Sequence, residues 1–199
     1  MNKKELYKQA RRTLLLAKRE EFSKYFTDDF TLSGSEVWFC TPNDEMTGLF
    51  AVEHYSRVCR NDYLTFDVKT ELLEQIEEGD CLVTSFVWSG TPRPNYLEIA
   101  GGMPGIFVEG ANPTFKIVII THFRGDKICK EMSVHNTIQT EIAFCNGDKK
   151  ATIDKLTHVF DVFEVANERF KSGEQFIPDP SEKIRDFKIN ISEGDFAWK

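Results

Sequence analysis

The sequence has 199 residues and a net charge of -7, and 41% of its residues are hydrophobic and 29% charged. This composition is typical of a globular protein and excludes a disordered chain or a disulfide scaffold. A chain of this length fits one domain with appendages. On folding, such a chain buries roughly 70% of the surface that it exposes when extended.

Three patterns exclude further classes of protein. The longest aliphatic stretch, Ile117 to Ile120, is far shorter than the ~20 residues of a membrane-spanning helix. The first residues lack the apolar segment of a secretory signal, and none of the five cysteines forms a CxxC pair, so we expect a cytoplasmic protein with free thiols. The four histidines lack HxH or HExxH spacing, and we expect neither a metal nor a cofactor.

The basic residues concentrate at the start of the chain, where the first 26 residues hold eight Lys or Arg and three Asp or Glu. The rest of the chain is therefore acidic, which argues against a nucleic-acid partner. Apolar residues recur at steps of three, four or five over residues 3–26, which predicts one long amphipathic helix that ends near Tyr25. Thr27, Asp28 and Asp29 then predict a capping turn, which we favour over a catalytic pair.

A loop and a second helix are expected next. Residues 31–46, which include Trp38, combine glycine, proline, asparagine and aspartate and predict a loop with one short strand at most. Thr47 predicts the N-cap of a second helix, on which His54 and Tyr55 lie on the half-buried side. For His54 a packed structural role is more common than that of a base.

Residues 64–89 alternate apolar and polar side chains and predict two strands that turn at Glu78-Gly79-Asp80. Trp88 lies at the end of the second strand and either lines a pocket or fills the core. Residues 90–113 contain five Gly and four Pro, which indicates a long irregular lid or binding loop.

Residues 114–136 predict a second hairpin that turns at Gly125-Asp126. Regular pairing from that turn gives one mostly apolar face, made of Phe115, Ile117, Ile119, Thr121, Phe123, Ile128, Lys130, Met132, Val134 and Asn136. We expect this face to line an enclosed cavity, so that His122, His135 and Glu131 point outward. Residues 137–142 are interpreted as an extension of the second strand.

The last part of the chain changes character. Ile153 to Phe170 form a helical stripe rich in phenylalanine, and Pro178 and Pro180 precede a loosely attached arm. We expect residues 1–142 to form one α+β domain, and residues 143–199 to add a helix and arm that pack on this domain or on a partner subunit. Because the polar sheet face and the stripe both need cover, we predict a homodimer.

The order of a long helix, the segment YFTDDF, a second helix opening with Thr-Gly and a hairpin-rich sheet resembles the nuclear-transport-factor-2-like, or cystatin-like, superfamily. Within it, GIFVEGANPTFKIVIITHFRGDKICKEMSVHN resembles the SnoaL-like polyketide cyclases of the ketosteroid-isomerase-like branch. The resemblance spans roughly residues 5–142. It implies a curved, mostly antiparallel sheet wrapped around N-terminal helices as a cone with a pocket.

The resemblance assigns Pro113-Thr114 to the Pro-Thr that enters the strand and Lys127-Ile128 to the Lys-Ile of the turn. Phe115 and Asp126 replace two glycines of the pattern. Asn136 replaces the aspartate that acts as general acid or base in SnoaL-like cyclases. An amide cannot exchange a proton near neutral pH, although it can orient a ligand.

Three functions follow from this resemblance. The first is binding of a small apolar or carbonyl-bearing molecule, with Asn136, Met132, Tyr25, Trp38, Tyr55, Trp88 and Phe115 as the expected ligand contacts. The second is a cofactor-free isomerase, cyclase or dehydratase that uses another acid or base, such as His54, Asp28 or His122. The third is a non-catalytic interaction or scaffold subunit. The missing aspartate favours the first.

Overall fold

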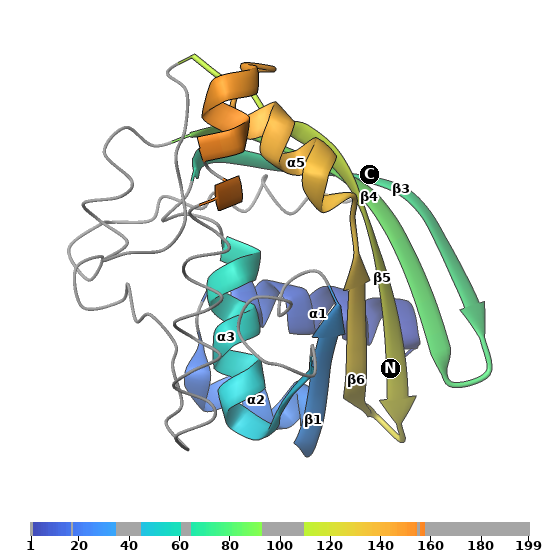
Figure 1. Ribbon diagram of the computed structural model, residues 1–199. Helices are drawn as coiled ribbons and strands as arrows, with labels where there is room; N and C mark the ends of the chain where they lie inside the picture. Colours follow the sequence, from blue (N-terminus) through green and yellow to red (C-terminus); the bar gives the residue numbers. More distant parts are fainter. Residues whose placement is uncertain are drawn as a thin grey trace.

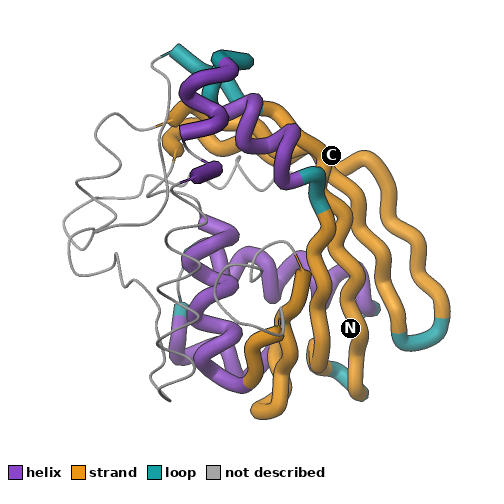
Figure 2. The backbone as a smooth tube through the Cα atoms, viewed as in Figure 1, coloured by secondary structure: helices purple, strands orange, loops and turns teal. Residues whose placement is uncertain are grey.

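The structure is a computed structural model that describes residues 2–16, 18–34, 45–60, 65–92, 110–154 and 156–157. Its centre is a curved, unclosed six-stranded sheet in the order β2-β1-β6-β5-β4-β3. Strands β1 and β6 pair in parallel, and the other neighbours pair antiparallel. Helices α1 and α3 cover one end of the concave side, and α5 lies at the other end (Figures 1 and 2). The α+β prediction is therefore confirmed.

The first helix is shorter than predicted. α1 spans Lys3–Leu15, and a 3-10 turn, η1 (Arg19–Glu21), leads into the short helix α2 (Phe22–Tyr25). The predicted stripe contained a five-residue step from Ala17 to Phe22, which would turn Phe22 away from the buried side of a straight helix. The break returns Phe22 to the core, where its exposed fraction is 1%.

The predicted capping turn at residues 27–29 is wrong, because these residues belong to strand β1 (Phe26–Gly34). Phe26, Phe30 and Leu32 are buried, while Asp28 and Asp29 are exposed. The short strand β2 (Glu45–Thr47) pairs with β1, and α3 (Gly48–Arg60) begins directly after Thr47, as predicted.

Both predicted hairpins are confirmed. β3 (Thr65–Glu78) and β4 (Cys81–Pro92) pair across the turn at Gly79, and β5 (Thr114–Arg124) and β6 (Lys127–Val134) pair across the turn at Gly125. The predicted lid lies mostly outside the described residues, between 92 and 110.

The register of the second hairpin differs from the prediction by one residue. Arg124 pairs with Lys127 and Phe123 with Ile128 as expected, but His122 pairs with Lys130, which leaves Cys129 as an extra residue in β6. This β-bulge reverses the two faces of β6 beyond it, because side chains alternate along a strand. Glu131 and Ser133 therefore lie on the buried face, and Met132 and Val134 on the outer one.

The extension of the second strand is also wrong, because residues Thr137–Phe144 form helix α5. Asn146 and Gly147 adopt positive φ in the predicted turn, and residues 149–154 start the predicted C-terminal helix. Asp148 caps this helix by accepting a hydrogen bond from the Ala151 N–H at 2.7 Å. The rest of the stripe, from residue 158, and the arm lie outside the described residues, so the division at 142/143 stays a prediction.

The core lies between α1, α3 and the concave side of the sheet. Its most buried members include Leu14, Phe30, Leu82 and Ile119, all at 1% exposed or less. Gly34 lets β1 pass close to β6, because a Cβ atom there would lie 2.1 Å from the Ser133 carbonyl oxygen. Within the described residues, no helix is long and apolar enough to cross a membrane.

Candidate functional site

A buried carboxyl group, that of Glu131 on β6, is the centre of the candidate site. The bulge at Cys129 directs Glu131 to the concave side, where its exposed fraction is 1%. The Thr121 hydroxyl on the paired strand β5 donates a hydrogen bond to Glu131 Oε1 at 2.6 Å. The second oxygen, Oε2, is buried and makes no hydrogen bond with the described part of the chain.

Burial raises the pKa of Glu131, because removal from water disfavours the charged form. The positive charge of Arg11 opposes this shift, followed by the hydrogen bond from Thr121 and an interaction with the Tyr55 hydroxyl. Burial is the dominant effect. A carboxyl group with a raised pKa is suited to carry a proton closer to neutral pH, which is the property of a general acid.

Arg11 and Tyr55 connect the two helices to this carboxyl group. Arg11 on α1 donates a hydrogen bond to the Tyr55 hydroxyl on α3, and both residues are buried. The Arg11 guanidinium also lies over aromatic rings, 5.0 Å from the Tyr55 ring centroid and 6.0 Å from that of Phe86. The nearby carboxyl group and the rings together compensate the buried positive charge.

Further polar atoms on the concave side lack partners. Ser133 Oγ and Trp88 Nε1 are buried and, like Glu131 Oε2, form no hydrogen bond with a described residue. Ser133 follows Glu131 by two residues on β6, and Trp88 lies on the inner side of β4. Buried polar groups in proteins are usually paired, so these atoms indicate a place for water or a ligand.

An aromatic cluster closes the end of the concave side nearest α5. Trp88 stacks on Phe115 at 4.8 Å between ring centroids, and Phe144 of α5 lies 6.0 Å from Trp88. His135 lies 5.6 Å from Phe115, and burial lowers the pKa of His135. Together these side chains form an apolar wall with one imidazole at its edge.

Of the other residues predicted from the sequence, Tyr55 and Trp88 are buried and Phe115 is partly buried on the same concave side. Tyr25 is also partly buried against the core. His54 is 4% exposed, hence more deeply buried than predicted. Trp38 lies outside the described residues.

Asn136 and Met132 do not lie where the regular pairing predicted. Asn136 is exposed, and its side-chain oxygen caps α5 by accepting a hydrogen bond from the Gln139 N–H at 3.0 Å. Met132 is on the outer face. The prediction that Asn136 faces an enclosed cavity is therefore wrong, because the bulge turns Glu131 and Ser133 inward instead.

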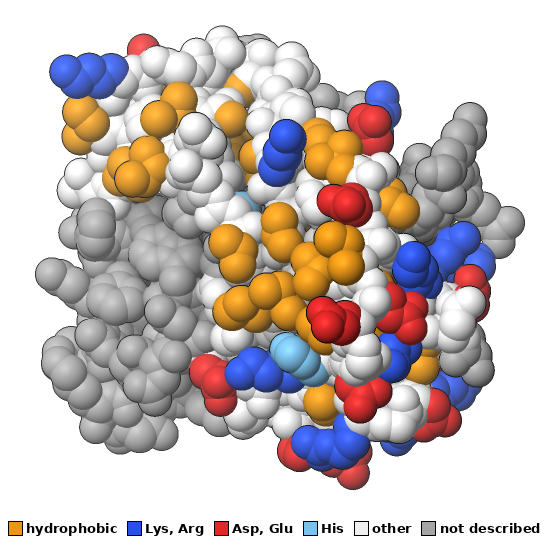
Figure 3. Space-filling model, turned by 90° about the vertical axis from the view of Figure 1, so that its right-hand side faces the viewer, with side chains coloured by type: hydrophobic (Ala, Val, Ile, Leu, Met, Phe, Trp, Pro, Cys, Tyr) orange, Lys and Arg blue, Asp and Glu red, His pale blue; other side chains and the backbone are white. Residues whose placement is uncertain are grey.

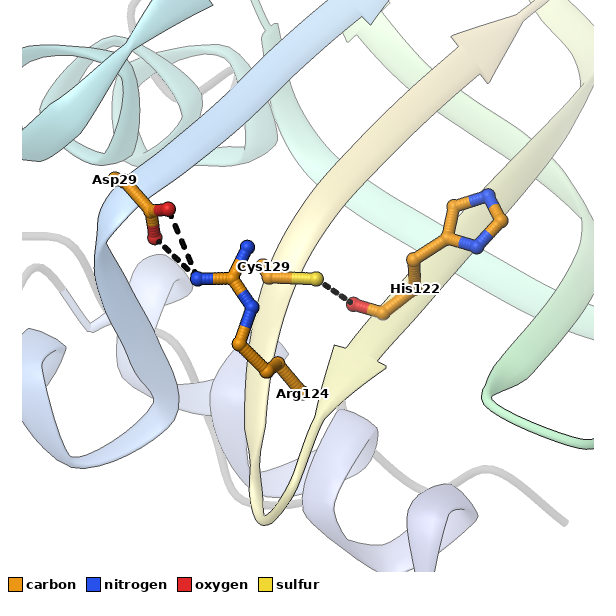
Figure 4. Close-up of polar contacts among 4 residues, drawn as sticks. All are labelled: Asp29, His122, Arg124 and Cys129. Carbon is orange, nitrogen blue, oxygen red and sulfur yellow. Dashed lines mark hydrogen bonds and ion pairs between the residues drawn. The ribbon is translucent and has the colours of Figure 1, made fainter.

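The two other acid–base candidates, Asp28 and His122, are exposed. Figure 4 shows the His122 ring directed away from the ion pair in which Arg124 Nη1 lies 2.9 Å from Asp29 Oδ2. Arg124 lowers the pKa of Asp29 through this contact. None of these groups reaches the concave side. The described residues also contain no group of three His, Cys, Asp or Glu placed to hold a metal ion.

Comparisons with known proteins identify the fold. Neither the protein-family models nor the curated proteins give a match. Among solved structures, a proposed polyketide cyclase from Acidithiobacillus ferrooxidans has a TM-score of 0.54 at 14% identity, over 73% of this chain and 95% of its own. TsrD from Streptomyces laurentii has a TM-score of 0.52 at 12% identity, over 74% and 99% of the two chains.

An NTF2-like protein of unknown function from Burkholderia pseudomallei has a TM-score of 0.50 at 11% identity, over 70% of this chain and 95% of its own. The chain therefore has the NTF2-like fold, as the sequence resemblance implied. At these identities the likeness shows the fold and not the reaction, because one fold hosts many functions.

Proposed function

We propose that this chain binds a small, mainly apolar molecule against the concave side of its sheet. The observation that carries the proposal is the set of three buried polar atoms without described partners: Glu131 Oε2, Ser133 Oγ and Trp88 Nε1. Leaving such atoms unpaired costs about 1–3 kcal/mol each, so a ligand that pairs with them recovers this free energy.

The chemistry of these atoms indicates the ligand class. The indole N–H of Trp88 only donates, a hydroxyl donates or accepts, and a protonated carboxyl group can donate. The oxygens of ketone or quinone carbonyls can accept a hydrogen bond from each of these three kinds of group. The apolar surroundings, with Phe86, Phe115 and Tyr55, suit a flat ring system. The polyketide cyclase of similar fold agrees with this class only by analogy.

Native mass spectrometry of the purified full chain tests the proposal, followed by titration with a panel of aromatic ketones. We expect either a co-purified small molecule or saturable binding that Ser133→Ala and Trp88→Phe weaken by about tenfold. Asn136→Ala is the matched control, because Asn136 is exposed at the end of the same strand region. Absence of both a co-purified mass and panel binding would refute the proposal.

A second candidate function is proton transfer at the carbon next to a carbonyl group, and one observation favours it. Burial raises the pKa of Glu131, and its second oxygen is buried without a hydrogen bond to a described residue. The test is deuterium uptake by the same ketone panel in D₂O. Glu131→Gln should abolish the protein-dependent exchange without unfolding the chain. Exchange at the buffer rate with the unmodified protein would rule this function out for the panel.

The cytoplasmic location and the scaffold role predicted from the sequence remain proposals. Binding alone and catalysis differ in one measurable respect, since only catalysis requires a titratable group at position 131. A variant Glu131→Gln that retains ketone binding and loses exchange supports the enzyme. A protein that binds the panel and exchanges no deuterium supports the binding protein.

A further inference from the structure

The sheet ends in a long strand edge that the described part of the chain leaves open. In the sheet order, β3 has β4 on one side and no strand on the other, whereas the opposite edge is the three-residue strand β2. Apart from their pairing with β4, residues 69–78 of β3 form no backbone hydrogen bond with a described residue. Alternate residues of an edge strand direct their N–H and C=O groups outward, where an added strand can pair with them.

A bulge and an anchored turn delimit the regular part of this edge. The pairing of β3 with β4 shifts at Leu73, and regular pairing runs over residues 74–78. The turn that follows is held to α1, because Lys3 Nζ lies 3.0 Å from Asp80 Oδ1 and also donates a hydrogen bond to the Gly79 carbonyl oxygen. The stretch between bulge and turn is therefore fixed in extended form before a partner binds, which lowers the cost of binding.

On the outer face, this stretch presents an acidic, an apolar and an acidic side chain in turn. Gln75 faces the concave side, where its side chain donates a hydrogen bond to the Thr84 hydroxyl at 3.2 Å. Glu74, Ile76 and Glu78 point the other way, because side chains alternate along a strand. All three are exposed, and neither glutamate forms an ion pair with a described residue. Figure 3, which views the molecule from the side on which β3 lies in Figure 1, shows acidic side chains beside hydrophobic ones.

We propose that β3 binds an extended segment of a partner protein as an added strand, and that this segment carries a basic, an apolar and a basic side chain at alternate positions. Residues directly opposite each other in paired strands share one face. The two basic side chains therefore meet Glu74 and Glu78, and the apolar one meets Ile76, which is 54% exposed. Main-chain hydrogen bonds supply the affinity, and the three side-chain contacts supply the sequence preference.

Charge decides which partner this edge accepts. Residues 69–78 contain four glutamates and one lysine. A second copy of β3 that paired antiparallel around Ile76 would place Glu74 opposite the partner's Glu78, and like charges directly opposite each other are destabilising. The edge is thereby protected against its own copies and against other acidic strands. The same glutamates favour a basic segment, because opposite charges stabilise cross-strand pairs.

The first test titrates the full chain into a fluorescently labelled peptide with the core sequence Lys-Thr-Val-Thr-Lys and measures fluorescence anisotropy. We expect saturable binding, which the double variant Glu74→Lys, Glu78→Lys weakens by about tenfold or more. The control is Glu20→Lys, Asp126→Lys, which changes the net charge equally at two exposed positions outside β3. Absence of saturable binding up to about 1 mM protein, or an equal loss in the two double variants, overturns the proposal.

The second test uses the unmodified chain and separates strand addition from charge attraction alone. The same peptide, N-methylated at each core residue, keeps both lysines and loses the backbone donors that an added strand needs, so it should bind about tenfold more weakly. The parent peptide should also slow hydrogen exchange in residues 74–78 and not in β6. Equal binding of the two peptides, or protection confined to other parts of the chain, overturns strand addition. Neither test contains a ketone, so neither depends on the ligand proposed for the concave side.

Discussion

Replacing Thr121 by valine tests whether the hydrogen bond to Glu131 organises the buried site. Thr121 is 0% exposed and donates to Glu131 Oε1 at 2.6 Å. Valine keeps the shape but removes the donor, which leaves both carboxyl oxygens without a hydrogen bond from the paired strand. A buried polar group that loses its hydrogen bond costs about 1–3 kcal/mol, so we expect the free energy of unfolding to fall by about 2 kcal/mol.

Urea denaturation measures this loss. With a slope of about 2 kcal/mol per molar urea, the midpoint should fall by about 1 M. Thr84→Val is the matched control, because Thr84 is also 0% exposed and accepts a neutral hydrogen bond from Gln75 Nε2 at 3.2 Å. The control should lose about 0.5–1 kcal/mol. Equal losses in the two variants would show that the Glu131 carboxyl group gains nothing special from Thr121.

Three other predictions follow from the same structure. Burial raises the pKa of Glu131 in the folded state, so the folded protein binds the proton more tightly, and its stability should decline as pH rises from the ordinary value of 4.5 through the raised pKa. Glu131→Gln should remove that decline in urea titrations across this pH range, and an unchanged slope would contradict the assignment. Gly34→Ala should lower the free energy of unfolding by about 3 kcal/mol or more, because the φ of Gly34 is +93° and a Cβ atom there would clash with the Ser133 carbonyl oxygen. Gly147→Ala is the control. It should lower the free energy of unfolding by about 1 kcal/mol, because the φ of Gly147 is +76° but no atom lies within 4 Å of its added Cβ. Asn136→Ala should lower the free energy of unfolding, measured by thermal unfolding, by about 1 kcal/mol, because α5 loses its cap. Ketone binding should be unchanged. Weaker ketone binding by this variant would show that Asn136 contacts the ligand.

The sequence by itself determined the fold class and most of the elements. The alternation over residues 64–89 and the turn residues at Gly79 and Gly125 predicted both hairpins, since period-two patterns and glycine turns are local properties of the chain. The helix after Thr47 followed from its cap and its apolar spacing. The superfamily resemblance predicted the curved sheet and its packing around the N-terminal helices.

Local patterns were less reliable at the ends of elements. The continuation of the hairpin predicts that residues 137–142 extend the second strand, but Asn136 is a good helix cap and α5 begins directly after it. The capping side chains of residues 27–29 predict a turn, but burial of Phe26 and Phe30 holds these residues in β1. In both places tertiary packing or capping outweighed the pattern on which the prediction relied.

Only the tertiary structure decided which face of β6 lines the interior. One extra residue at Cys129 exchanges the two faces, and a single sequence carries no pattern that marks such a bulge. Regular pairing therefore predicted Asn136 inside and Glu131 outside, and the structure has them reversed. The raised pKa of Glu131 likewise depends on burial beneath α1 and α3, where Arg11 and Tyr55 approach it from distant parts of the chain. The fold thus brings a carboxyl group inside at Glu131, whereas the resemblance placed the expected acid at position 136, where this chain has an exposed asparagine.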